Sequence, residues 1–171
     1  LNEAVKQLKG EMEEEDFTTT IDLNVDAFIP DSYIPNEYQK LDIYKRIAAI
    51  ESDEEREDME EELIDRFGDS PKKVGTLLEV AALKARAHKL YVTTIEQKGD
   101  MYTFTMYEHA KVQPERIPKL IELFRGSLTF RAENYTFVYV HKIRNKRENP
   151  PMATEIVAKV LDGIARILVQ N

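Results

Sequence analysis

The sequence contains no cysteine, and only six of its 171 residues are glycine. Without cysteine the chain can form no disulfide, no thiolate nucleophile and no cysteine-ligated zinc site. No apolar run approaches the roughly 20 residues that a membrane-spanning helix requires. The first residues also lack the basic-then-apolar pattern of a signal peptide. The composition is compatible with a reducing cytoplasm, and we expect no membrane partner.

Motifs for nucleotide binding and nucleophilic catalysis are also missing. None of the glycines begins a G-x-x-x-x-G-K-[ST] loop, and neither G-x-G-x-x-G nor G-x-S-x-G occurs. The three histidines, His88, His109 and His141, are far apart and have no acid at metal-ligand spacing. We therefore expect no catalytic residue, no cofactor site and no metal site in this chain.

Basic residues are too few to balance the acids, and the formal net charge is −8. An acidic balance argues against a stand-alone binder of nucleic-acid backbones, because such surfaces need clustered lysine and arginine. It fits a protein that meets a basic protein surface, or simply a soluble one. The length predicts one domain or two closely joined lobes. Leu1 in place of an initial methionine favours a piece of a longer protein.

Hydrophobic periodicity predicts a mostly helical first half. A helix end over 1–11 and a half-buried strand over 18–28 precede three helices, over 38–50, 52–67 and from 71. Along the first of these helices, Leu41, Tyr44, Ile47 and Ala48 share one face. Ser52 and Glu55 form a capping box, and Gly68 is expected as a left-handed stop. Ser70 is expected to cap the third helix, with Pro71 at its first position.

The second half predicts two β-hairpins, each followed by a helix. The strands are expected over 91–97 with 101–108 and over 128–132 with 135–141, and the helices from 114 and over 154–169. Tyr102, Phe104 and Met106 are expected to face the interior. The fold class is α+β: a helical N-terminal lobe and an antiparallel sheet with helices packed on it. We expect one continuous core, with at most a lobe boundary near residue 90.

The acidic run from Glu51 to Asp65 is the most unusual local feature. On a helix with Met59, Leu63 and Phe67 buried, Glu54, Asp58, Glu61, Glu62 and Asp65 spread over the opposite face. Carboxylates that spread outward do not converge on a metal ion, although a divalent-ion enzyme is one hypothesis. Two other interpretations are a solvated helix face and a docking surface for a basic partner.

A short basic cluster precedes the last helix and consists of Lys142, Arg144, Lys146 and Arg147. It could touch nucleic acid, with the hairpin aromatics stacking on bases, or it could be a solvated loop. The alternation of the aromatics favours a position in the sheet core. A nucleic-acid-binding accessory domain thus stays the alternative hypothesis.

Three stretches of the first half, in this order and spacing, resemble the C-terminal domain of the transcription-repair coupling factors (Mfd). They are 27–34 (AFIPDSYI), 41–48 (LDIYKRIA) and 62–68 (ELIDRFG), with Pro71 behind. The resemblance is specific up to Leu90 and concerns only the layout after it. A glycine common in the family after the third helix is replaced by Leu90-Tyr91-Val92. The resemblance divides the chain into 1–26, a connection from an upstream motor, and 27–171, the C-terminal domain.

The resemblance implies a regulatory domain without catalytic activity, cut from a cytoplasmic ATP-dependent DNA translocase that acts on stalled RNA polymerase. The domain would pack on an N-terminal UvrB-like module, hide its UvrA-binding surface and restrain the motor. ATP, Mg²⁺ and DNA would bind the parent protein elsewhere. In the third stretch, Leu63 and Phe67 anchor the helix, Arg66 suits the helix dipole and Gly68 permits the stop. Predicted contacts with the UvrB-like module are Asp58, Glu61, Glu62 and Asp65.

Overall fold

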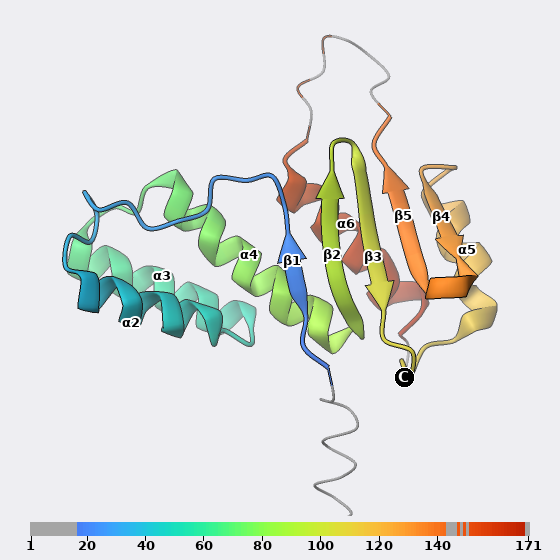
Figure 1. Cartoon of the computed structure of the whole chain (residues 1–171), viewed down its shortest axis with the longest axis horizontal. Helices are drawn as coiled ribbons and strands as arrows, with labels where there is room; N and C mark the ends of the chain where they lie inside the picture. Colours follow the sequence, from blue (N-terminus) through green and yellow to red (C-terminus); the bar gives the residue numbers. More distant parts are fainter. Residues whose placement is uncertain (1–16, 143–146, 148, 150, 170–171) are drawn as a thin grey trace, which may run out of the picture.

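A computed structural model of the chain describes residues 17–142, 147, 149 and 151–169. Figure 1 shows a mixed sheet with helices behind it and a helical extension on one side. No described helix combines the length and apolar character needed to cross a membrane. The helix end expected over 1–11 lies outside the described residues. In chain order the elements are β1 (Thr20–Asp22), α2 (Glu37–Ala48), α3 (Asp53–Phe67), α4 (Lys72–Lys89), β2 (Val92–Lys98), β3 (Met101–Met106), the 3₁₀ turn η1 (Pro114–Arg116), α5 (Ile117–Leu123), β4 (Leu128–Arg131), the 3₁₀ turn η2 (Ala132–Asn134), β5 (Thr136–Val140) and α6 (Ala153–Ile167).

The sheet has the strand order β1-β2-β3-β5-β4. Strands β2 with β3 and β4 with β5 form the two predicted hairpins, and β3 joins them by antiparallel pairing with β5. Strand β1 is parallel to β2 at one edge. The strand expected over 18–28 is only three residues long. A Val25 N–H to Leu23 C=O bond of 3.0 Å turns the chain away from the sheet soon after it.

Burial alternates along β3, which defines the core face of the sheet, whereas both faces of β5 are buried up to Tyr139. The α+β prediction is confirmed. Tyr102, Phe104 and Met106 are buried as predicted. Helices α4, α5 and α6 pack on the core face, behind the sheet in Figure 1. The opposite face is rich in threonine, with paired rows that include Thr20, Thr94, Thr103, Thr105, Thr129 and Thr136.

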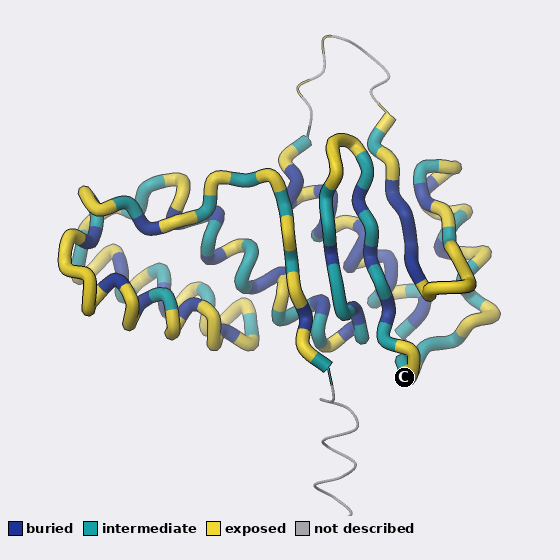
Figure 2. Tube along the Cα trace, in the orientation of Figure 1, coloured by how far each residue is buried: buried dark blue, intermediate teal, exposed yellow. Residues whose placement is uncertain are grey.

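The buried residues form two clusters, so the prediction of one continuous core is wrong. The sheet lobe (β1 to β5, α5, α6 and the C-terminal half of α4) buries 20 apolar residues in one cluster. The helical lobe (the segment from Ala27, α2, α3 and the N-terminal half of α4) buries nine in the other. Figure 2 shows buried positions along α4 in both parts of the molecule. The division falls within α4, between Leu78 and Leu83, because successive turns of one long helix face different partners.

Helix α2 buries a face that only partly matches the predicted one: Ile47 is buried and Tyr44 packs against the core, as predicted, but Leu41 and Ala48 do not. Lys40, Ile43 and Ile47 are buried, whereas Leu41 is 56% exposed and Ala48 is also exposed. Both sets have helical spacing, so periodicity alone did not separate them. The buried set is selected by packing, because Ile43 and Ile47 belong to the same cluster as Leu63 of α3.

Capping explains where the helices of this lobe begin. Ser52 Oγ accepts from the Glu55 N–H at 3.1 Å, as the capping-box prediction requires. The Glu55 carboxylate reaches back to the Glu51 N–H at 2.6 Å, one residue earlier than in the standard box. The cap predicted for α4 is wrong by one position: α4 begins at Lys72, and Pro71 is its N-cap with no side-chain bond. The extended ψ of 155° at Pro71 keeps that residue outside the helix.

Candidate functional site

The three sequence stretches of the helical lobe meet at the C-terminal end of α3. Tyr33 comes from the first stretch, and its hydroxyl donates to the Gly68 carbonyl at 2.8 Å and lies 3.1 Å from the Leu63 carbonyl. The Tyr33 and Phe67 rings pack with centroids 5.8 Å apart. Tyr33 thereby provides a donor for the Gly68 carbonyl, which follows the last turn of α3 and has no partner within the helix.

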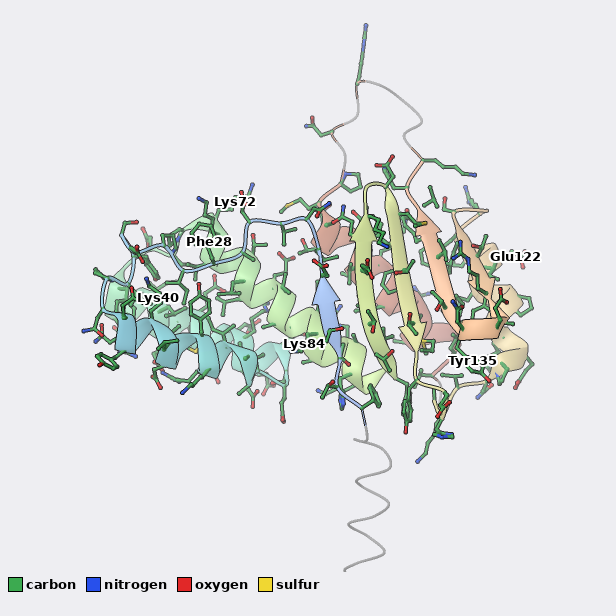
Figure 3. The ribbon with its side chains drawn as sticks, viewed as in Figure 1. Phe28, Lys40, Lys72, Lys84, Glu122 and Tyr135 are labelled. Carbon is green, nitrogen blue, oxygen red and sulfur yellow. The ribbon has the colours of Figure 1, made fainter. Side chains whose placement is uncertain are left out.

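The first stretch is joined to helix α2 by a hydrogen bond and an ion pair. The Ile29 N–H donates to Tyr44 Oη at 2.8 Å. Lys40, which is largely buried, pairs with Asp31 and also reaches Glu37 at 3.3 Å. These contacts raise the pKa of Lys40, with the Asp31 hydrogen bond the largest cause. Figure 3 shows Lys40 within the helical lobe.

Glu62 joins the second and third stretches through a bidentate ion pair with Arg46 of α2. Arg46 Nη2 donates to Glu62 Oε1 at 2.6 Å, Arg46 Nη1 contacts the other carboxylate oxygen, and Arg66 Nη1 donates to Glu62 Oε2 at 3.1 Å. The hydrogen bonds from Arg46, followed by those from Arg66, lower the pKa of Glu62 to about 2. Glu62 is therefore a bridge between helices, a role that sequence reasoning missed along with its partner Arg46.

Gly68 ends α3 with φ +88° and ψ −172°. This conformation differs from the left-handed helical one predicted, and it is more strictly confined to glycine. The other motif residues have packing roles: Leu63 is completely buried, Phe67 is partly buried, and the Arg66 guanidinium lies 5.0 Å from the Phe67 ring centroid. The motif thus builds the joint between α2, α3 and the segment before α2.

The remaining acids of the predicted set lie on the solvent face of α3. Asp58, Glu61 and Asp65 are exposed, and none takes part in the ion pairs found among the described residues. Their spacing of three, four and seven places them on one side of the helix. We call these three residues the α3 acidic face. It is a surface of uncompensated negative charge on a helix fixed by the joint described above.

The other candidate residues lie far apart or make packing contacts within the fold. His88 Nε2 lies 3.0 Å from the Phe17 carbonyl, His109 pairs with Glu108, and His141 lies beside Tyr139. Within the described ranges, no three His, Asp or Glu side chains are grouped as metal ligands. The hairpin aromatics Tyr102, Phe104, Phe137 and Tyr139 are buried in the sheet core, so these four rings do not present a face to a nucleic-acid base, whereas Tyr135 is exposed. Of the basic cluster, Arg144 and Lys146 lie outside the described residues.

The structure shows how the chain turns after α4 without the glycine that is common there in the family. Tyr91 takes its place with φ +65°, a left-handed conformation that is uncommon for residues other than glycine. The Tyr91 carbonyl accepts from the Tyr107 N–H at 2.7 Å, which fixes the turn between α4 and β2. The local backbone therefore has the shape that a glycine would favour, with a tyrosine in the position.

These features define a class of protein: an α+β domain whose two lobes share a long helix and whose helical lobe carries an exposed acidic helix face. Residues 23–117, more than half of the chain, match the family described as the TRCF domain. The chain belongs to this family.

Similar proteins and a solved structure agree with this assignment. The transcription-repair-coupling factor of Bacillus subtilis is 40% identical over 124 residues, which cover 72% of this chain and 10% of that protein. The factor of Staphylococcus haemolyticus is 39% identical over 115 residues, covering 66% and 10%. A crystal structure of the C-terminal domain of a transcription-repair coupling factor superimposes with a TM-score of 0.71 and 26% identity. It covers 88% of this chain and 93% of that one. The chain thus spans about a tenth of the length of the curated relatives it matches.

Proposed function

We propose that this chain is a regulatory domain without catalytic activity in a cytoplasmic transcription-repair coupling factor. In this proposal the domain docks on a UvrB-like module of the same protein through the α3 acidic face. It covers the surface that UvrA uses and restrains an ATP-driven DNA motor until RNA polymerase is engaged. ATP and Mg²⁺ belong to the motor, and DNA and polymerase are reached through the full-length protein.

The observation that carries the proposal is the α3 acidic face beside the family motif. Asp65 lies inside that motif and is exposed, while its neighbours Leu63 and Phe67 have packing roles. Nothing in the packing of the helical lobe requires an acid at this position. Carboxylates that are free in the isolated domain are suited to pair with arginines or lysines of a partner, which gives orientation and specificity.

Glu62 has a different place in this proposal from its three neighbours. Arg46 and Arg66 already neutralise it, so a partner's cation would have to compete with an existing bidentate pair. Glu62 stays in the predicted contact because it lies beside the α3 acidic face. Its removal, however, also breaks the ion pair that joins α2 to α3. Variants of Asp58, Glu61 and Asp65 test docking more cleanly than variants of Glu62.

The first prediction concerns docking. The triple change Asp58→Ala, Glu61→Ala and Asp65→Ala should weaken binding of this chain to the UvrB-like module about tenfold or more. Interfacial ion pairs become costly to break once they are partly desolvated. Isothermal titration calorimetry with the purified module measures the affinity. In full-length protein, the same changes should increase UvrA binding and raise ATP turnover without polymerase.

The matched control removes three exposed acids from the sheet lobe: Glu115→Ala, Glu133→Ala and Asp162→Ala. Both triple variants change the net charge equally, so a general charge effect would weaken both. Equal affinities for the module in wild type and the α3 variant, with unchanged melting temperatures, would contradict the proposal and leave the face as solvated helix surface.

A further inference from the structure

A second charged site lies in the sheet lobe, away from the α3 acidic face. It is a cleft of about 450 Å³ where the end of α5, the start of β4, the end of β5 and the middle of α6 come together. Its eight lining residues include three fixed cations and one histidine, and none of the eight is acidic. They are Leu123, Phe124, Arg125, Ser127, Tyr139, His141, Lys142 and Lys159. In a chain with a net charge of −8, such a concentration of positive charge is a local exception.

The base of this cleft is held by packing and backbone bonds. Phe124 and Tyr139 meet edge to face with centroids 5.9 Å apart, and both are buried. The Val140 N–H donates to the Ser127 carbonyl at 2.9 Å, which ties the end of β5 to the start of β4. Lys159 Nζ lies over the Phe124 ring, 5.9 Å from its centroid. The cations therefore project from a prearranged support.

In the part of the chain that the structure describes, none of the three cations, Arg125, Lys142 and Lys159, forms an ion pair with an acidic side chain. Glu122, labelled on α5 in Figure 3, is exposed and does not line the cleft. Like charges gathered without counter-charges repel one another, and this repulsion is relieved when an anion binds between them.

Arg125 adds an independent observation, because its backbone is strained. It follows the last turn of α5 with φ +49°, the position and conformation in which helices usually place glycine. Gly126, the next residue, also has a positive φ of +87°. A non-glycine residue in this conformation costs stability and is found most often where the side chain serves a function. Here that side chain lines the cleft.

We propose that this cleft binds a phosphate group. The Arg125 guanidinium and the Ser127 hydroxyl come from the loop between α5 and β4, one ammonium group follows β5 and the other lies on α6. A tetrahedral anion can accept from several directions at once. A planar carboxylate accepts mainly in one plane and fits this arrangement less well. The phosphate is supplied either by a nucleic-acid backbone or by a free phosphate compound, and both present the same tetrahedral anion.

The test uses the whole 171-residue chain and two probes, inorganic phosphate and a short single-stranded oligonucleotide of mixed sequence. Amide NMR shifts of Arg125, Ser127 and Lys142 should change on titration with phosphate or the oligonucleotide. Arg125→Gly and Lys159→Gln should each weaken binding about tenfold, because each removes charged hydrogen bonds. For the oligonucleotide, the logarithm of affinity should fall with the logarithm of salt concentration with a slope of about −2 for three contacts on a single strand.

Arg125→Gly separates a binding role from a structural one. It removes the strained residue together with the cation, so the variant should melt at the same temperature as wild type or higher while binding is lost. The matched control is Lys45→Ala, which removes one exposed cation from α2 and should bind both probes as wild type does. If only the oligonucleotide binds, the ligand of the cleft is a nucleic-acid backbone. If both probes bind, a single phosphate group is sufficient as the ligand. The proposal is overturned if neither probe shifts the cleft amides, or if Arg125→Gly binds as tightly as wild type.

Discussion

At the residue scale, Glu62 is held in its ionised form by two arginines, one from its own helix and one from α2. Its side chain is 34% exposed, so water screens the interaction and limits its contribution to stability. The value of this bridge is geometric as well as energetic. The bidentate pair with Arg46 fixes the rotation of α3 relative to α2, and this rotation determines where the α3 acidic face points.

The second prediction follows from the pKa of Glu62, which is lowered to about 2 from a reference value of 4.5. A lowered carboxyl pKa stabilises the fold above the unfolded-state value, and the gain disappears as the pH falls through the folded-state value. Glu62→Gln should therefore cost about 0.5–1 kcal/mol of unfolding free energy at pH 7. The difference from wild type should shrink between about pH 4.5 and pH 2.

Urea denaturation at several pH values measures this difference, and Glu61→Gln serves as its control. Glu61 is exposed on the same helix and has no ion pair in the described part, so Glu61→Gln should cost less unfolding free energy at pH 7 than Glu62→Gln. A pH-independent loss in Glu62→Gln would show that packing, and not the charge of this carboxylate, supports the joint.

At the element scale, α6 approaches α5 closely because it carries a glycine at the contact. A Cβ built on Gly163 would lie 3.0 Å from Phe124 Cε2 and 3.1 Å from Leu120 Cδ1. These distances are shorter than ordinary van der Waals contacts. Gly163 thus sets the spacing between two helices that cover the sheet. Phe124 also forms the base of the cleft for which phosphate binding is proposed, called the phosphate cleft below.

The third prediction is that Gly163→Ala destabilises the fold by about 1 kcal/mol. Overpacking costs about 1–3 kcal/mol and outweighs the gain of up to about 1 kcal/mol in helix propensity. Gly75→Ala is the matched control, since Gly75 lies in helix α4 with no atom within 4 Å of a built Cβ. That variant should be stabilised by about 0.5–1 kcal/mol. Thermal melting of both variants measures these changes. A higher melting temperature for Gly163→Ala than for wild type would show that α5 shifts to accommodate the added methyl group without loss of stability.

At the scale of the whole molecule, two cores of unequal size share one long helix. The helical lobe buries nine apolar residues and the sheet lobe 20. A smaller core supports less stability, so the helical lobe is expected to open locally while the sheet stays folded. Such an arrangement suits a docking element, because partner binding to α3 would be coupled to the stability of this lobe.

The fourth prediction tests this division with native-state hydrogen exchange. Leu63→Ala removes a completely buried side chain from the helical lobe and should cost that lobe about 2–5 kcal/mol. Amides of α2 and α3 should lose protection, while those of β3 and β5 should keep most of theirs. Equal losses of protection throughout the chain would show that the two lobes unfold as one cooperative unit.

Local features of this protein were predictable from its sequence. Alternation placed Tyr102, Phe104 and Met106 in the core, and turn and capping residues located the hairpins, the start of α3 at Ser52 and its end at Gly68. The acidic face was predictable for the same reason, since helical spacing separates Asp58, Glu61 and Asp65 from Met59 and Leu63. Each of these features depends on residues within a few positions of one another.

Only the tertiary structure decided the features that join distant residues. The Arg46–Glu62 bridge spans 16 positions and exists because α2 and α3 pack with those side chains facing each other. The same packing buries Ile43 and leaves Leu41 exposed. Packing also divides the buried residues into two clusters whose boundary lies within α4. The phosphate cleft gathers residues from positions 123 to 159 that no local pattern connects. Sequence spacing determines which side of an element a residue occupies, whereas contacts between elements depend on how those sides are brought together.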